Sequence, residues 1–565
     1  MPHTRTIAAR LLLTAGMLAA LVGMLCTCPG CVPKAEGPAD TFGLDFTMPP
    51  DMPVAGALVF VVDGVNAAVF EEMLQAGQLP ALRRYFVDRG LYAPRAIANT
   101  PSVTLANQVS LITGLYPGHH GIPGVNWFDR NQLIWRNYET IAQKNTLDGD
   151  YLAPTLFNRL SDQTTFSIFY QAHRGATKFV ENWTSAGPPY YFGWYEYVDR
   201  LTLYRLGMAM DLARRRRQFP ALTVAYLLAP DFRGYEHGVG SSEYRDALRH
   251  TDRQIGRVLG DVQRAGLLDR LVIALVSDHG MDHIERHLGL EDFLRRRVGL
   301  EVAAKHLWEK QSFEDRQDYY DRFSTVVCGT GDRYRAVCLR RPIRRDGGAA
   351  GWEAWTVRPT PRDLEDYPTR QGPMDLPKVL ICQDAVDVLA YVAGPDRVRV
   401  RVQGGEVEFA QDGGAGRPIT YRHVCGLADP LGWRGRVSDE LLAGRPGSPR
   451  AWLEATAGTN HPDLPAQILA YFRSHLAGDI ALFARPGYDF GDAYTGGHGG
   501  LWPVDMHTPM LLAGPGVPHR RQQLARTVDL VPTLLSLSGR PVPPGLDGAS
   551  LVEPATRPAG PDGGP

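Results

Sequence analysis

Three continuous apolar runs, each followed closely by an aspartate, constrain the fold of this chain most. The runs occupy residues 57–62, 222–228 and 271–277. Half-exposed strands alternate apolar and polar residues, whereas strands buried on both faces of a parallel sheet have uninterrupted apolar sequences. Between the last two runs, residues 241–266 carry apolar side chains on one helical face. This alternation of strands and helices predicts an α/β fold built on a doubly wound, mostly parallel sheet.

The aspartates that follow these runs predict a metal site. In a doubly wound sheet, ligands bind beyond the carboxyl ends of the strands, so Asp63, Asp231 and Asp278 should project into one crevice. Carboxylates that lie this close repel one another unless protons or cations separate them. His279 follows Asp278 directly, and His498 lies in the glycine-rich segment GGHGG. Mixed aspartate and histidine ligation suits zinc best, ahead of manganese or iron, although capping or loop roles are the alternative for each residue alone.

Thr104 stands where a helix is expected to begin. It follows a Pro-Ser turn, and the apolar residues after it recur at helical spacing as far as Gly114. The free N–H groups and the positive dipole end of a helix N-terminus favour a phosphate or an alkoxide. The sequence therefore makes Thr104 a candidate nucleophile, and a simple helix cap is the alternative role.

Charge and length exclude some classes of partner. The chain has 565 residues, with 60 Lys and Arg against 61 Asp and Glu, and a formal net charge of −1. Such a balance does not favour a nucleic-acid polymer or an anionic membrane surface as an electrostatic partner. The length is sufficient for a large core and for more than one folded unit.

The first 53 residues have the character of an export signal and a tether. Two arginines precede an apolar run from Leu11 to Leu25, which predicts a secretory signal peptide over residues 1–31. Three cysteines stand where a lipoprotein carries its lipidated residue: Cys26, Cys28 and Cys31. Residues 32–53 resemble a linker. We therefore expect an exported protein, either a periplasmic or cell-envelope lipoprotein or a secreted form, whose only membrane connection would be this lipid anchor.

The middle of the chain predicts an inserted subdomain. About two hundred residues separate the segments SDHGM and GGHGG, far more than a connection requires. Residues 397–402 alternate in polarity and are followed by glycine-rich turns, a pattern typical of antiparallel hairpins. We expect a catalytic α/β domain from residues 54–300 and 451–545, a mixed α+β cap over 301–450, and a flexible tail over 546–565. The sequence leaves open whether the cap selects substrates or is only scaffolding.

Five motifs occur in an order that resembles a known enzyme family. They are VVDGVN, PSVTLAN with TGLYPGHHGI, APDFRGYEHG, SDHGM and GGHGG. This series is similar to the alkaline phosphatase superfamily, specifically its type I phosphodiesterase/nucleotide pyrophosphatase branch and the exported bacterial members of that branch. The resemblance implies a hydrolase that cleaves a small phosphoester substrate, with two zinc ions as cofactors and a phosphothreonine intermediate.

The resemblance also implies a role for individual residues. One zinc ion would be bound by Asp63, Thr104, Asp278 and His279, and the other by Asp231, His498 and a histidine that follows Asp231. Thr104 would be the nucleophile. Asn126 would bind the phosphoryl group, and Asn107 would be structural.

One motif departs from the family pattern Asp-x-x-Gly-His-x-x-Gly. Counted forward from Asp231, the metal-binding histidine should stand at Tyr235, but counted back from Gly240 it stands at His237. Either the loop is two residues longer so that His237 binds the metal, or Tyr235 binds it, or the site is weakened. We favour His237, because imidazole is much the commoner ligand.

Two classes of function remain open at this stage. The first is a zinc phosphohydrolase for phosphodiesters or nucleotide pyrophosphates, with a phosphomonoesterase or phosphonate hydrolase as close variants. A sulfatase is disfavoured, because the sequence around Thr104 lacks the Cys/Ser-x-Pro-x-Arg pattern of that relative. The second is a catalytically silent binding protein that keeps the fold, for which the irregular motif at Tyr235 is the only support.

Overall fold

The computed structural model describes residues 56–139, 143–180, 183–304, 311–329, 331–345, 348–491 and 493–553. The predicted signal peptide and linker lie outside these ranges, as does most of the predicted tail. Among the described helices, none combines the length and apolar character needed to cross a bilayer.

The first sheet has eight strands, and the three apolar runs of the sequence form its central strands. The order is β25–β2–β24–β8–β1–β7–β5–β6. Strands β7 and β8 both pair in parallel with β1, and only β24 runs antiparallel to its neighbours. The strand bounds are β1 (Gly56–Val62), β2 (Leu91–Ile97), β5 (Thr165–Ile168), β6 (Lys178–Val180), β7 (Leu222–Leu227), β8 (Leu271–Val276), β24 (His507–Ala513) and β25 (Arg520–Arg521). The expected mostly parallel sheet is confirmed.

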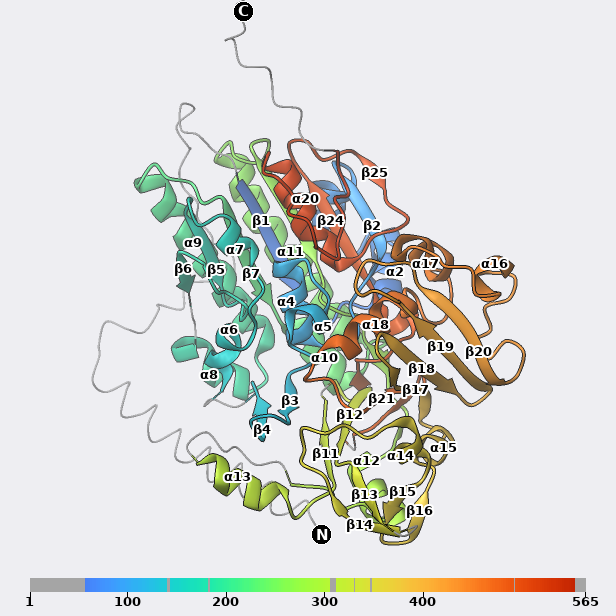
Figure 1. The fold of residues 1–565 in the computed structure, drawn as a ribbon. Coiled ribbons are helices and arrows are strands. Elements are labelled where there is room, and N and C mark those ends of the chain that lie inside the picture. Colours follow the sequence, from blue (N-terminus) through green and yellow to red (C-terminus); the bar gives the residue numbers. More distant parts are fainter. Residues whose placement is uncertain are drawn as a thin grey trace, which may run out of the picture. The chain divides into compact units, whose positions relative to one another are not determined.

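Both faces of this sheet are buried, as its uninterrupted apolar strands require. In β1, Val59 and Val61 pack with residues of α4 and α20, while Leu58 and Phe60 on the opposite face are also buried. Figure 1 shows these helices with the strands that they cover. The longer helices are α2 (Ala67–Gln75), α4 (Thr104–Thr113), α8 (Trp183–Tyr191), α9 (Tyr195–Arg215), α10 (Ala229–His237), α11 (Ser242–Arg264) and α20 (Leu530–Leu537). The doubly wound arrangement is therefore confirmed.

A second, seven-stranded sheet is entirely antiparallel. Its order is β11–β12–β21–β17–β18–β19–β20. The predicted hairpin strand at residues 397–402 is β18, which pairs with β17 and β19. The bounds are β11 (Thr325–Cys328), β12 (Tyr334–Leu339), β17 (Val386–Gly394), β18 (Arg397–Val402), β19 (Gly405–Ala410), β20 (Thr420–Gly426) and β21 (Ile480–Ala484). Because β21 follows residue 450, this sheet draws on chain from both sides of the boundary expected there.

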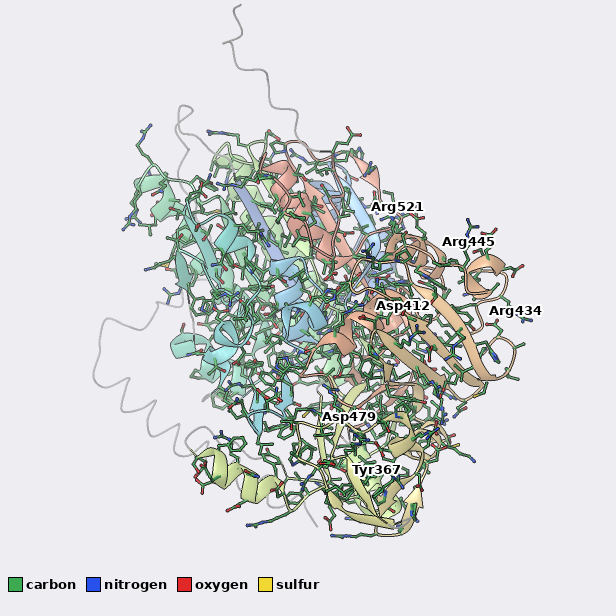
Figure 2. All side chains as sticks on the ribbon, in the orientation of Figure 1. Tyr367, Asp412, Arg434, Arg445, Asp479 and Arg521 are labelled. Carbon is green, nitrogen blue, oxygen red and sulfur yellow. The ribbon has the colours of Figure 1, made fainter. Side chains whose placement is uncertain are left out.

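Shorter elements connect the two sheets. The β-hairpin β3 (Asn126–Asp129) and β4 (Ile134–Asn137) belongs to the first part of the chain, and α18 (Leu464–Arg473) packs against α5 (Pro117–His120). A buried ion pair of 2.8 Å joins Arg130, in the turn of this hairpin, to Asp479, the residue before β21. Figure 2 labels Asp479, together with the exposed Asp412 and Arg434, which lie in the segments that follow β19 and β20. The remaining helices of eight or more residues are α13 (Phe313–Tyr320) and α17 (Pro449–Thr456).

Candidate active site

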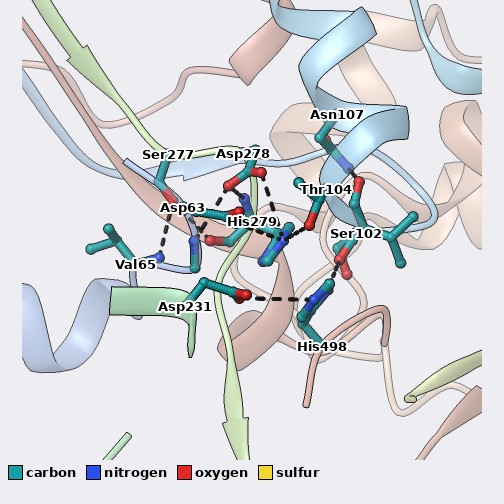
Figure 3. A network of polar contacts seen from close by, with 12 residues as sticks. Asp63, Val65, Ser102, Thr104, Asn107, Asp231, Ser277, Asp278, His279 and His498 are labelled. Carbon is teal, nitrogen blue, oxygen red and sulfur yellow. Dashed lines mark hydrogen bonds and ion pairs between the residues drawn. The ribbon is translucent and has the colours of Figure 1, made fainter. Parts of the chain in front are cut away.

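The three aspartates predicted to share a crevice do come together in the structure. Asp63 follows β1, Asp278 follows β8 after one serine, and Asp231 lies in the first turn of α10 directly beyond β7. All three side chains are at most 5% exposed. Together with His279 and His498 they form two clusters of possible metal ligands, whose ligand atoms lie within 4.8 Å of one another (Figure 3).

We call Asp63, Asp278 and His279 the first ligand group. His279 Nε2 lies 3.3 Å from Asp63 Oδ1 and 3.7 Å from Asp278 Oδ2. The other ring nitrogen, Nδ1, is 2.9 Å from the carbonyl oxygen of Gly280 and donates to it. This bond places the proton on Nδ1, so the lone pair of Nε2 faces the two carboxylates.

We call Asp231, Tyr235 and His498 the second group. His498 Nε2 lies 3.9 Å from Asp231 Oδ1, and its ring stacks on His279 with centroids 3.6 Å apart. His498 Nδ1 donates to the carbonyl oxygen of Ser102 at 2.9 Å, so Nε2 again carries the lone pair. The two imidazoles thus present their basic nitrogens to the same small volume.

Unsatisfied carboxylate oxygens show that this volume suits a cation. Asp63 Oδ1, Asp231 Oδ1 and Asp278 Oδ2 are buried without a hydrogen-bond partner, an arrangement that is unfavourable unless a cation or a proton satisfies it. Burial, reinforced by the neighbouring carboxylates, raises the pKa of Asp63 and Asp231 well above the usual range. Burial also raises the pKa of Asp278 to about 7 and lowers those of His279 and His498. Neutral imidazoles among carboxylates that lack partners fit divalent metal ions.

Thr104 is the first residue of α4, as the sequence predicts. Its Oγ1 lies 3.1 Å from His279 Nε2, which places the hydroxyl at the edge of the first ligand group (Figure 3). The helix ends at Thr113, where Gly114 adopts a φ of 74°. Asn107 holds the turn before the helix, because its side chain accepts from the Asn99 N–H and donates to the Pro101 carbonyl oxygen.

Asn126 is buried at the start of β3, but it does not join this network. Its Oδ1 accepts from the Gly329 N–H at 2.7 Å, and its Nδ2 donates to the Gly329 carbonyl oxygen at 3.4 Å. Among the described residues, no hydrogen bond links Asn126 to Thr104 or to a ligand group. The side chain is therefore fixed by the connection between β11 and β12 and retains one amide hydrogen for another acceptor.

The structure does not support the wider loop expected between Asp231 and His237. Helix α10 continues to His237, so residues four apart lie on one face while His237 points elsewhere. The His237 side chain is 40% exposed and lies 3.6 Å from the Glu236 carboxylate. Tyr235, one turn after Asp231, places its hydroxyl 2.7 Å from His498 Nε2. Tyr235, and not His237, therefore lies beside Asp231 and His498 in the second group.

Three polar residues that the sequence analysis did not select support the ligands. Tyr226 donates its hydroxyl hydrogen bond to Asp63 Oδ2. Ser277 accepts from the Val65 N–H at 3.0 Å and donates to the His279 carbonyl oxygen at 2.9 Å. Ser102 accepts from His498 through its carbonyl oxygen. Tyr226 and Ser277 were visible as polar atoms within apolar runs, whereas a backbone acceptor has no sequence signal.

Comparisons of sequence and of fold both find similarity to the family that the five motifs resemble. The family described as type I phosphodiesterase / nucleotide pyrophosphatase matches residues 57–329. Mouse ectonucleotide pyrophosphatase/phosphodiesterase family member 1 is 27% identical over 262 residues, which cover 42% of this chain and 24% of that protein. The uncharacterized pyrophosphatase/phosphodiesterase C725.05c of Schizosaccharomyces pombe is 26% identical over 272 residues, 47% of this chain and 53% of that protein. The chain thus spans about a quarter to about half of the length of these relatives.

Solved structures show the same fold over a larger share of the chain. Human ectonucleotide pyrophosphatase/phosphodiesterase 5 superposes with a TM-score of 0.53 and 14% identity, covering 87% of this chain and 97% of that one. The murine protein of the same name, in an inactive form in complex with AMP, gives a TM-score of 0.53 with 13% identity and covers 87% and 96%. Residues 57–329, which carry four of the five motifs, are thus similar to the type I phosphodiesterase / nucleotide pyrophosphatase family, and these solved structures share the fold of the chain.

Proposed function

We propose that this protein is a metal-dependent phosphohydrolase that cleaves phosphodiester or nucleotide pyrophosphate bonds with Thr104 as its nucleophile. One observation carries the proposal: Thr104 is the first residue of a helix, and its hydroxyl lies 3.1 Å from His279, beside buried carboxylate oxygens that have no hydrogen-bond partner. A structural helix cap would not need to face a cluster of metal ligands.

Two metal ions, proposed to be zinc, would be held by the chain's own donors. Asp63, Asp278 and His279 would bind the first ion with Thr104, and Asp231 and His498 would bind the second. Such a pair would lower the pKa of a hydroxyl and stabilise the charge that develops during an in-line displacement. The buried acceptors that lack partners in both groups support this assignment.

The protein residues supply the rest of the mechanism. Thr104 Oγ1 loses its proton as it attacks phosphorus, the bond from phosphorus to the leaving oxygen breaks, and a phosphothreonine results. The free N–H groups in the first turn of α4 face the negative charge that develops on the phosphoryl oxygens. Asn126 donates its remaining amide hydrogen to one of these oxygens. Water then attacks phosphorus, and Thr104 leaves with its hydroxyl restored.

The substrate that we favour is a small nucleotide with a phosphodiester or pyrophosphate bond. The names of the relatives describe pyrophosphatase/phosphodiesterases, and one structural neighbour was solved with AMP. The relatives also include ectoenzymes and venom phosphodiesterases, which supports the proposal that this chain acts after export. A lipid anchor at Cys26, Cys28 or Cys31 is part of the same proposal.

Hydrolysis of a defined panel tests the function. The full chain is assayed with bis(4-nitrophenyl) phosphate, 4-nitrophenyl phosphate and 4-nitrophenyl sulfate, before and after chelation and with zinc added back. We expect the diester to be hydrolysed fastest. We also expect activity to be lost when the metal is removed and to be restored by two equivalents of zinc. Full activity in metal-free protein, or preference for the sulfate ester, would contradict the proposal.

Variants of Thr104 separate chemistry from folding. Thr104→Ala should abolish turnover and keep the fold and most of the metal, since the other ligands remain. Thr104→Ser should retain some activity, because the hydroxyl survives. Near-normal turnover by the alanine variant would remove Thr104 from the mechanism.

The second candidate is a binding protein without catalytic activity. Tyr235, which lies where the family has a histidine, is the observation that favours it. Two bound zinc ions with no hydrolysis of any phosphoester would move this candidate ahead of the enzyme.

A further inference from the structure

We propose that the phenol oxygen of Tyr235 is itself a ligand of the second metal ion, which is then bound by a carboxylate, an imidazole and a phenolate from Asp231, His498 and Tyr235. This inference deepens the proposed function and rests on it for the presence of two metal ions. It gives the second site one more negative charge than a site of one aspartate and two histidines would have.

Helix geometry brings the carboxylate and the phenol together. Asp231 and Tyr235 are four positions apart in α10, so their side chains lie on the same face about one turn apart. The Thr495 N–H donates to the Tyr235 carbonyl oxygen at 3.0 Å. This bond ties the backbone of Tyr235 to the segment that carries His498, three residues later.

A glycine allows the helix to lie directly on that segment. A Cβ atom added at Gly496 would lie 2.1 Å from the carbonyl oxygen of Gly234, so the two backbones are in contact there. Gly234 itself packs against Met281, whose sulfur would lie 2.2 Å from an added Cβ. Because Gly496 has no room for a larger side chain, close packing holds the backbone of α10 against the segment that carries His498.

The Tyr235 hydroxyl lies within hydrogen-bond distance of the His498 nitrogen that would bind the metal. His498 Nδ1 donates to Ser102, which leaves Nε2 as the ligating atom, and the Tyr235 hydroxyl lies 2.7 Å from this Nε2. Ligand atoms around a tetrahedral zinc ion with bonds of ~2.0 Å lie about 3.3 Å apart. The separations of 2.7 Å to Tyr235 and 3.9 Å to Asp231 span this value. On binding, the phenolic proton leaves to solvent and the oxygen binds the cation.

The ring of Tyr235 is oriented by its neighbours. It makes edge contacts with Tyr494, at a centroid distance of 5.2 Å, and with His498, at 5.4 Å. His237 is the alternative ligand, but it lies on another face of α10 and pairs with Glu236. A simple hydrogen bond from Tyr235 to metal-bound His498 is the other alternative, and the experiment distinguishes it.

Absorption of the ferric protein tests ligation without any need for turnover. The full chain is freed of metal and reloaded with Fe³⁺, because a phenolate bound to ferric iron gives a visible charge-transfer band. We expect this band in the parent protein and in Tyr494→Phe, the matched control that removes the neighbouring phenol. We expect no band in Tyr235→Phe. Iron bound without the band in the parent protein, or a band that survives in Tyr235→Phe, would overturn the proposal.

Zinc titration provides the second readout. Tyr235→Phe should weaken one of two zinc sites by about 100-fold or more, a larger effect than loss of a hydrogen-bonding partner usually causes. His237→Ala should leave both zinc sites unchanged. Tyr235→His should bind zinc at both sites with an affinity close to that of the parent protein, and this variant provides the test if Tyr235→Phe does not fold. Two unchanged zinc sites in Tyr235→Phe would overturn the proposal. A band together with two zinc sites but no hydrolysis would support this ligand and refute the proposed function, so the two failures are distinguishable.

Discussion

The two ligand groups are built in different ways. In the first group, Asp63 and Asp278 follow neighbouring strands, and β1 and β8 pair in parallel with Val61 opposite Val276. Sheet register alone therefore brings these two carboxylates together. In the second group, Asp231 and Tyr235 come from a helix, and His498 comes from a segment more than two hundred residues later. Only tertiary packing brings these three side chains together.

The second sheet supplies much of that packing. The His498 N–H donates to the Gly331 carbonyl oxygen at 2.7 Å, and the Arg333 N–H donates to the His498 carbonyl oxygen at 3.1 Å. The same connection between β11 and β12 holds Asn126 through Gly329. The family match ends at residue 329, where this connection begins. The first ligand group is thus a property of the parallel sheet, whereas the second depends on how the antiparallel sheet packs against it.

The largest expected effect is the loss of a carboxylate from the first group. Asp278→Asn should remove one metal equivalent and lower turnover by about three orders of magnitude or more, because the stabilisation supplied by one ion is several kcal/mol. Metal analysis and kcat measure both effects. Asp231→Asn should instead remove the other equivalent. Loss of both equivalents in either variant would mean that the two groups are not independent.

A substitution at Gly331 tests whether the second sheet holds His498 in place. Gly331 has a φ of 76°, and an added Cβ would lie 2.8 Å from the His498 ring. Gly331→Ala should therefore displace His498, weaken the second metal ion and lower kcat by about 10- to 100-fold, while the first ion remains. Gly372→Ala is the matched control, because its φ is 100° and nothing lies within 4 Å of an added Cβ. Equal losses in the two variants would show only a general loss of stability.

A change of one pH unit should affect metal binding somewhat less than the Gly331→Ala substitution does. Burial raises the pKa of Asp278 to about 7 in the metal-free protein, and only the carboxylate binds a cation. Affinity for the first ion should thus fall by up to about tenfold per pH unit as the pH drops below 7. Because the folded-state pKa is raised, this carboxyl stabilises the metal-free fold below the ordinary aspartate pKa, and the contribution is lost as the pH rises through about 7.

Thermal unfolding at several pH values checks the sign of this effect. Between pH 5 and 8 the increase in Tm caused by saturating zinc should grow, because protons compete less with the metal at higher pH. A zinc-induced increase that is constant across this range would show that Asp278 does not exchange a proton for the ion.

The smallest expected effect comes from a residue that holds a ligand. Tyr226→Phe removes the hydroxyl that donates to Asp63 and leaves Asp63 Oδ2 without that partner. We expect about a tenfold loss of affinity for the first ion and no change at the second. Zinc titration of the variant measures both sites, and an equal loss at both would contradict the separation of the groups.

The first ligand group could be predicted from the sequence more completely than the second. The strands and the positions of Asp63 and Asp278 could be predicted, because apolar runs are local and the residues after them lie at the carboxyl edge of the sheet. Thr104 was predicted at its helix start for the same reason. His237 was chosen from motif spacing, although Asp231 and Tyr235 already had the four-residue spacing of one helix face. The bonds from Gly329 and Gly331 connect distant segments and left no local pattern.

The hydrogen bond between His498 and Ser102 has a consequence for the order of folding. It joins residues 396 positions apart in the chain. Closing a loop of this length carries a large entropic penalty, and contacts of such high sequence separation form slowly. The bond can persist only after the intervening chain, with most of both sheets, has folded. We therefore expect the second metal position to assemble last, so that uptake of its ion during refolding marks completion of the native chain.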